Sequence, residues 1–187
     1  MGLFSRKPVE ETADIYNSDR YRDFKRYLHL YFVDVDKCFV KFNSFDAAEN
    51  KSLYDAPVIE EIPRHISYYE TFLKVYQTLT GVEYKDEKSH SDNRDIVEAK
   101  VIVDVKNKKI IYILSVKDVD PINVPSLKQD KFVYDWLSVN DFLETLYSNK
   151  YVNYGDAYRD FVVDSISELF NIGDYIKTLR YTSNQDV

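Results

Sequence analysis

The chain has 187 residues, 44% of them hydrophobic and 30% charged, a length and balance typical of one globular domain with a full core. Its net charge of −7 argues against a protein that wraps a nucleic-acid backbone, because that binding depends on clustered Lys and Arg. A single cysteine excludes an intramolecular disulfide and a cysteine-based zinc site, and it indicates a reducing compartment such as the cytoplasm. No apolar run approaches the roughly 20 residues of a membrane span, so no membrane partner is expected.

Aromatic residues are more frequent than a core alone requires, with 17 Tyr and 11 Phe in the chain. Tyrosine combines a large apolar ring with a hydroxyl that tolerates water, and protein interfaces are enriched in it. An A/T-rich genome, such as that of many bacteriophages, would impose a similar composition through its codons. The sequence leaves both explanations open.

Residues 1–17 are expected to form a flexible arm. They combine a basic start at Arg6 and Lys7 with the apolar anchors Leu3 and Phe4. Such an arm is either a disordered terminus or a tail that orders against a neighbouring subunit.

One long helix is predicted over residues 19–46. Apolar residues recur there in steps of three and four, and Ser18 or Asp19 can cap the first turn. The alternative is a β-hairpin that turns near residues 34–37, because Tyr, Phe and Val favour strands. Alternation with a period of two is poor in this segment, which favours the helix. The apolar positions in steps of three and four are Tyr21, Phe24, Leu28, Tyr31, Val35, Cys38, Phe42 and Phe45.

A second helix is predicted over residues 63–80, after a loop around residues 49–61. Pro63 suits a first helical turn, and Gly81 suits the position just after a helix. The two helices would pack most simply as an antiparallel pair.

The pattern changes to a β-hairpin after an exposed loop over residues 82–95. Apolar side chains alternate with charged ones over residues 97–105, and Asn107-Lys108 provides a turn into the apolar run 110–116. A two-stranded sheet is marginal in water, so a third strand is expected, with residues 131–136 as the candidate.

The last third of the sequence is predicted to be helical. Ser138 caps one helix, Asp156 begins another that Gly173 ends, and a short helix follows over Asp174–Arg180. The sequence therefore predicts a mainly helical α+β domain over residues 18–181, with one antiparallel β-hairpin and a polar tail over residues 182–187.

The sequence gives only weak evidence for an enzymatic site, because four glycines in the whole chain leave few loops that could cradle a phosphate. The best candidate is Glu98 with Lys100, which point the same way on a strand and could share a metal-bound water in a metal-dependent nuclease. Asp86 or Asp95 could complete that metal site. The same spacing arises on any solvated strand face, which is the favoured interpretation.

The remaining reactive side chains are expected to be structural or solvated. His29, His65 and His90 are far apart in the sequence and show no metal-ligand spacing. Cys38 lies in the apolar pattern of the first predicted helix and is interpreted as a core residue.

The sequence favours a non-enzymatic assembly or adaptor protein that binds copies of itself or a larger partner. The aromatic surplus, the charged arm and the missing catalytic loops point to a virion component of an A/T-rich bacteriophage, such as a head-to-tail ring or connector. The alternatives are the nuclease described above and an acidic cytoplasmic inhibitor. No cofactor, metal ion or nucleic-acid partner is expected. The residues predicted to form interfaces are Leu3, Phe4, Arg6, Lys7, Tyr68, Tyr134 and Trp136.

Overall fold

The computed structural model describes residues 19–43, 53–84, 99–117, 119–148, 150–167 and 169. These residues form eight β-strands, three α-helices and a short 3-10 helix, η1 (Asp19–Tyr21). The prediction of a mainly helical domain with one β-hairpin is therefore wrong. The strands are β1 (Lys25–Asp34), β2 (Lys37–Asn43), β3 (Tyr54–Asp55), β4 (Val58–Ile62), β5 (Lys100–Asp104), β6 (Lys109–Val116), β7 (Leu127–Gln129) and β8 (Phe132–Ser138), and the helices are α2 (Tyr68–Thr80), α3 (Val139–Tyr147) and α4 (Asp156–Ser167).

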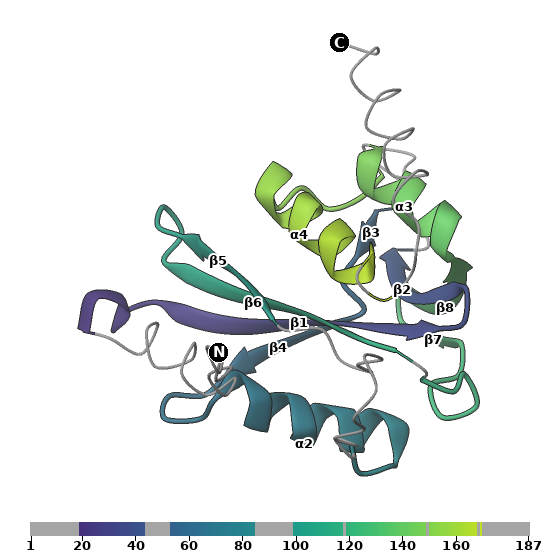
Figure 1. Ribbon diagram of the computed structural model, residues 1–187, viewed down its shortest axis with the longest axis horizontal. Coiled ribbons are helices and arrows are strands. Elements are labelled where there is room, and N and C mark those ends of the chain that lie inside the picture. Colours follow the sequence, from purple (N-terminus) through teal and green to yellow (C-terminus); the bar gives the residue numbers. More distant parts are fainter. Residues whose placement is uncertain are drawn as a thin grey trace, which may run out of the picture.

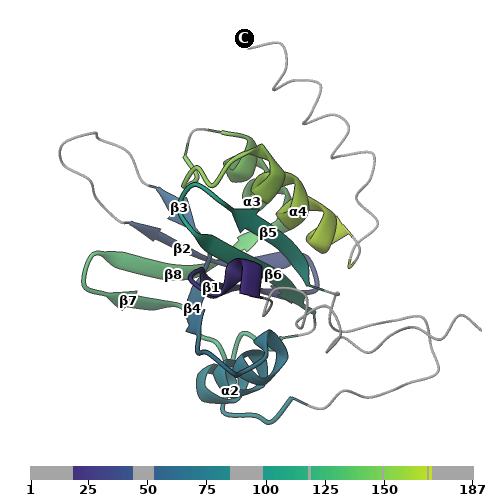
Figure 2. The same ribbon diagram turned by 90° about the vertical axis from the view of Figure 1, so that its left-hand side faces the viewer.

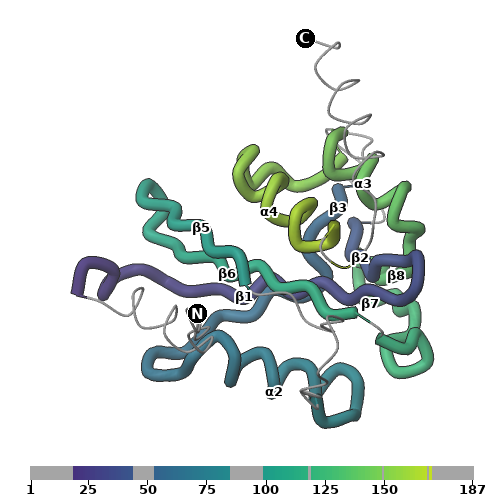
Figure 3. Tube along the Cα trace, in the orientation of Figure 1, coloured from purple at the N-terminus to yellow at the C-terminus, as the bar shows by residue number. Residues whose placement is uncertain are grey.

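The strands belong to one mixed sheet in the order β5-β6-β1-β2-β8-β7, with β3 paired to β2 and β4 paired to β1. Strand β1 lies parallel to β6, whereas the other pairs are antiparallel. Strand β1 is hydrogen-bonded along both edges, to β4 on one side and to β6 on the other. This places β1 at the centre of the fold (Figure 3).

Helices cover both faces of the sheet, with α2 on one side and α3 and α4 on the other (Figures 1 and 2). Side chains of β1 alternate between the two resulting cores. Leu28 and Leu30 pack in the core that contains Phe72 of α2. Tyr31 and Val33 pack in the core that contains residues of α3 and α4.

The long helix predicted over residues 19–46 is instead the hairpin formed by β1 and β2, which turns between Asp34 and Lys37. Because β1 is buried on both faces, its sequence is an almost continuous apolar run, as expected for a strand that is covered twice. The missing alternation therefore reflected two buried faces and not a helix. The predicted antiparallel helix pair is absent from the described residues for the same reason.

The turn of this hairpin contains a strained residue. Val35 adopts a φ of 45° and is 70% exposed, and a β-branched residue disfavours positive φ. Val35→Asn is expected to raise the free energy of unfolding by about 1 kcal/mol, because Asn tolerates this conformation. Urea denaturation measures the change. Val105→Asn is the matched control, because Val105 is also 70% exposed in a turn but has no positive φ; equal effects at both sites would contradict the strain.

Helix α2 confirms the helix predicted before Gly81, although it begins at Tyr68 and not at Pro63. Its first turn is set by Ser67, whose hydroxyl accepts from the Glu70 backbone N–H while the Glu70 carboxylate accepts from the Ser67 N–H. Gly81 ends the helix with a φ of 70°, a conformation that glycine adopts without strain.

Several other local predictions are confirmed. Strands β5 and β6 form the expected hairpin, β8 is the expected further strand, Ser138 caps α3, and Asp156 begins α4. Strand β8 pairs with β2 and β7, however, and β3 and β4 occupy part of the predicted loop 49–61. The arm 1–17, residues 85–95 of the expected exposed loop, Gly173, the helix predicted at Asp174–Arg180 and the tail lie outside the described residues.

No helix in the described part of the chain combines the length and the apolar character needed to cross a membrane.

Candidate functional site

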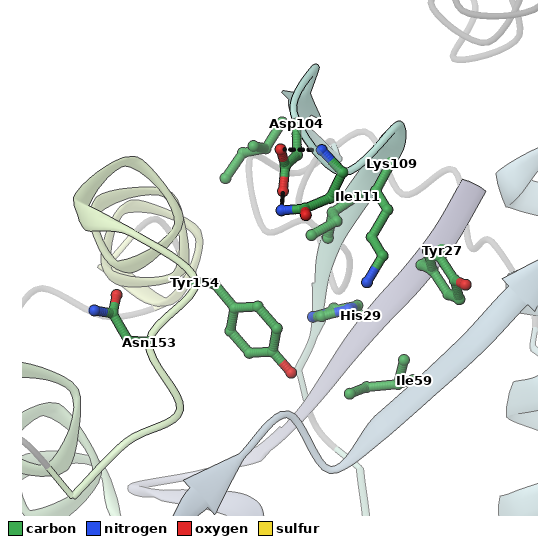
Figure 4. Close-up of a pocket in the computed structure, with 10 residues that line it drawn as sticks. Tyr27, His29, Ile59, Asp104, Lys109, Ile111, Asn153 and Tyr154 are labelled. Carbon is green, nitrogen blue, oxygen red and sulfur yellow. Dashed lines mark hydrogen bonds between the residues drawn. The ribbon is translucent and has the colours of Figure 1, made fainter. Parts of the chain in front are cut away.

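A cavity of about 540 Å³ lies on the sheet face that α3 and α4 partly cover (Figure 4). It is lined by side chains of β1, β4, β5 and β6, by the turn between β5 and β6, and by the segment before α4. This volume is in the range of small-molecule sites. The polar lining residues are Tyr27, His29, Asp104, Asn107, Lys109, Asn153 and Tyr154.

The floor of the cavity continues the core that lies beneath α4. Along β1, Tyr31 is fully buried, His29 is 3% exposed, and Tyr27 is only half-buried. Along β6 the same face changes from buried Ile111 to exposed Lys109. The site is therefore buried at its inner end and charged at its open end. Ile59, Ile102 and Ile111 supply the apolar part.

Tyr154 forms a wall that is held in place from two sides. Its hydroxyl donates to the Asp55 carboxylate at 2.7 Å, and its ring meets the His29 ring edge-on at 5.2 Å between centroids. Gly155 follows with a φ of 96°, and its N–H donates to the Asn153 side chain at 2.8 Å. Because glycine adopts positive φ readily, Gly155 lets the chain turn into α4 while Tyr154 stays against the sheet.

A line of buried hydroxyl groups runs from His29 into the core. His29 Nδ1 is hydrogen-bonded to the Tyr158 hydroxyl at 2.7 Å. The Tyr31 hydroxyl is 2.7 Å from that of Tyr158 and 2.7 Å from that of Tyr151. We call these three tyrosines the tyrosine relay. All three are at most 7% exposed, so their hydrogen bonds are made without water.

His29 is uncharged at neutral pH. Burial, reinforced by the positive charges of Lys41 and Lys109, lowers the pKa of its imidazole from 6.5 to about 3. The ring therefore offers the cavity a hydrogen-bonding nitrogen and no charge. Its Nε2 has no hydrogen-bond partner among the described residues.

Lys109 is the cation of the cavity. Its ammonium group lies 5.7 Å from the centre of the Tyr27 ring and has no ion-pair partner in the described ranges. Figure 4 shows it pointing toward His29. The nearby carboxylate of Asp104 is already engaged, because its two oxygens accept from the N–H and the side-chain amide of Asn107 at 3.0 and 2.7 Å. These bonds hold the pKa of Asp104 below its usual value.

Most of the predicted nuclease residues cannot be placed against this cavity. Lys100 begins β5, opposite Ile113 and on the strand that carries Asp104, whereas Glu98, Asp86 and Asp95 lie outside the described residues. Among the side chains that the structure describes, no group of three His, Cys, Asp or Glu residues could hold a metal ion. The combination of Lys100 with these acids stays a prediction.

The predicted interface residues fall in different environments. Leu3, Phe4, Arg6 and Lys7 lie outside the described residues. Tyr68 is 1% exposed and stacks on Tyr112, so its ring packs within the chain. Tyr134 and Trp136 are half-buried against Phe39, and the Trp136 indole N–H donates to the Val124 carbonyl at 2.8 Å. Self-association stays a prediction.

Neither His29 nor the tyrosine relay was predicted from the sequence as part of a site. His29 lies inside the predicted helix over residues 19–46 and was interpreted as an isolated histidine. The expectation that Cys38 is buried is confirmed. A usable signal was present, since Tyr27, His29 and Tyr31 alternate with Leu28 and Leu30. This places the polar aromatic groups on one face of a strand.

No protein-family model matches the sequence. A search of curated proteins finds no similar sequence. Solved structures that resemble the chain include a hydrolase of the Nudix family from Clostridium perfringens, with 11% identity and a TM-score of 0.44 over 77% of this chain and 95% of that one. The mutator protein MutT from Bacillus halodurans has 19% identity and a TM-score of 0.41 over 65% and 73%. Tm1382, described as a candidate Nudix hydrolase, has 12% identity and a TM-score of 0.48 over 88% of each chain.

These findings correct the functional expectation drawn from the sequence. The three solved structures are described as a Nudix hydrolase, a mutator protein and a candidate Nudix hydrolase, and none of the three is described as a virion component. The interpretation of the chain as a non-enzymatic adaptor, ring or connector of a bacteriophage is therefore contradicted. With identities of 11–19% and TM-scores below 0.5, the likeness assigns no reaction and no substrate to this chain.

Proposed function

We propose that this chain binds a small organic anion in the cavity between β1, β5, β6 and Tyr154. The observation that carries the proposal is that one cavity is lined both by Lys109, which has no ion pair in the described ranges, and by the buried, uncharged ring of His29, whose Nε2 has no hydrogen-bond partner there. A ligand with one anionic group and an apolar body would satisfy both ends of the site.

The anionic group belongs beside Lys109, whose ammonium group points toward the His29 ring (Figure 4). Lys109 has no carboxylate within ion-pair distance in the described ranges, although its charge helps to lower the pKa of Asp104, whose oxygens accept from Asn107. The two charges of the cavity sum to zero, so a ligand anion would compete for the Lys109 ammonium group with Asp104, which lies opposite Lys109 across β5 and β6. A ligand oxygen bound by an ammonium group gains about 1.5–3 kcal/mol when the contact is shielded from water and less when it is exposed.

The body of the ligand belongs over the isoleucine floor. Ile59, Ile102 and Ile111 come from three different strands, and the rings of Tyr27 and Tyr154 line the cavity with them. Such a lining contacts a flat or branched apolar group, and a few polar groups then fix its orientation.

The dye 8-anilinonaphthalene-1-sulfonate tests this proposal, because it carries a sulfonate on an aromatic body. Lys109→Gln is expected to weaken its binding about tenfold at low salt, since one charge-assisted contact of about 1.4 kcal/mol is lost. N-phenyl-1-naphthylamine has the same rings without the sulfonate, and its affinity should change by less than about twofold because it makes no such contact. Fluorescence titration measures both.

Lys128→Gln is the matched control, because Lys128 is an exposed lysine on β7 that does not line the cavity. It should leave both affinities unchanged. The proposal fails if the sulfonate dye does not bind, or if Lys109→Gln and Lys128→Gln affect its binding equally.

A further inference from the structure

The protonation state of the His29 ring decides which kind of ligand atom the cavity accepts. A neutral imidazole carries its single proton on Nδ1 or on Nε2, and the partner of one nitrogen determines the role of the other. Nδ1 is bonded to Tyr158 at 2.7 Å, so the tyrosine relay sets the state of Nε2.

Only one direction of the relay gives every buried hydroxyl proton an acceptor. If each hydroxyl donates toward His29, Tyr151 donates to Tyr31, Tyr31 to Tyr158, and Tyr158 to Nδ1. If the direction is reversed, the Tyr151 proton points away from Tyr31 and meets no acceptor among the described residues. A buried donor without an acceptor is costly, whereas an oxygen with an unused lone pair is far less so.

We propose that the tyrosine relay fixes His29 as an Nε2–H donor, and that this N–H selects ligands that present a hydrogen-bond acceptor to His29 beside Lys109. This inference rests on the proposed function for the ligand and on the relay geometry for the donor. Carboxylate, sulfonate and phosphate oxygens accept such a bond, whereas an ammonium or amidinium group would place two donors against each other. His29 and Lys109 therefore favour the same ligand class. His29 does so through the direction of its hydrogen bond, and Lys109 does so through its charge.

Nitrogen-15 NMR of the full chain measures the proton position directly. Long-range proton–nitrogen spectra distinguish the Nδ1–H, Nε2–H and averaged states of each histidine, and the signals that disappear in His29→Asn identify His29. The free protein at pH 7 is expected to show the Nε2–H form. An Nδ1–H form, or an average of the two forms, would overturn the inference.

The same spectra test the contact with the ligand. Saturating 8-anilinonaphthalene-1-sulfonate should shift the His29 Nε2 signal and slow the exchange of its proton with water, while N-phenyl-1-naphthylamine should do neither. Bound sulfonate dye with an unmoved Nε2 signal would exclude His29 as the selecting group. Because the proton position is measured without any ligand, its outcome is separate from that of the Lys109→Gln titration.

Discussion

Lowering the pH from 7 to 4.5 is expected to reduce the free energy of unfolding by about 2.5 kcal/mol through His29 alone. Burial first, and then the charges of Lys41 and Lys109, lowers the folded-state pKa of His29 to about 3, whereas the unfolded value is 6.5. Between these two values the unfolded chain binds one more proton than the folded chain. Stability is therefore complete above pH 6.5 and is lost as the pH falls toward 3. Urea denaturation at a series of pH values measures this slope.

A pair of histidine variants isolates the contribution of His29. In His29→Asn, the amide oxygen can replace Nδ1 as an acceptor for Tyr158 but cannot titrate, so the stability curve should become flatter between pH 7 and 4.5. His65→Asn is the control, because His65 is exposed and Asn tolerates its positive φ of 68°. A wild-type slope that persists in His29→Asn would show that other groups cause the pH dependence.

Tyr31→Phe is expected to destabilise the fold by about 2–3 kcal/mol, because it removes the middle hydroxyl of the tyrosine relay. Two hydrogen bonds of 2.7 Å are lost at once. The Tyr151 proton is then left in the core without an acceptor among the described residues. Chemical denaturation measures the change, and the phenylalanine ring keeps the packing against Phe142.

Tyr151→Phe is the matched comparison, because it removes the end of the relay and not its middle. Tyr31 can still donate to Tyr158, and Tyr158 to His29, so every remaining proton keeps its acceptor. A loss of about 1 kcal/mol is expected for this variant. If Tyr151→Phe costs as much as Tyr31→Phe, the hydroxyl groups do not act as a connected chain.

Local signals in the sequence predicted the elements whose cause is local. Ser138 and Gly81 mark helix ends because a hydroxyl can accept from free N–H groups and glycine tolerates positive φ. The alternation before Asn107 predicted the β5–β6 hairpin because only one face of that strand pattern was apolar. None of these features depends on distant residues.

The prediction failed where tertiary contacts decide the structure. Strand β1 lies between two cores, and burial on both faces removes the alternation that distinguishes a half-buried strand from a helix. The short strand β3 exists through its pairing with β2 and through the bridge between Tyr54 and Tyr151. Sequence periodicity contains no information on either neighbour.

The candidate site was beyond prediction for a related reason. His29 lies opposite Ile59 of β4, and Tyr27 lies opposite Ile111 of β6, so strand register and not sequence proximity assembles the floor. Its partner Tyr158 is 129 residues away along the chain. Only the alternation of Tyr27, His29 and Tyr31 could be read in advance.

The position of β1 determines how the cavity can respond to a guest molecule. Amide groups on a strand that is enclosed on all four sides exchange with deuterium only when the whole domain opens. His29 lies on that strand, so the inner wall of the cavity is rigid and keeps its shape when a ligand binds. Any adjustment during binding falls to the rim, where Lys109 and the β5–β6 turn are in contact with solvent.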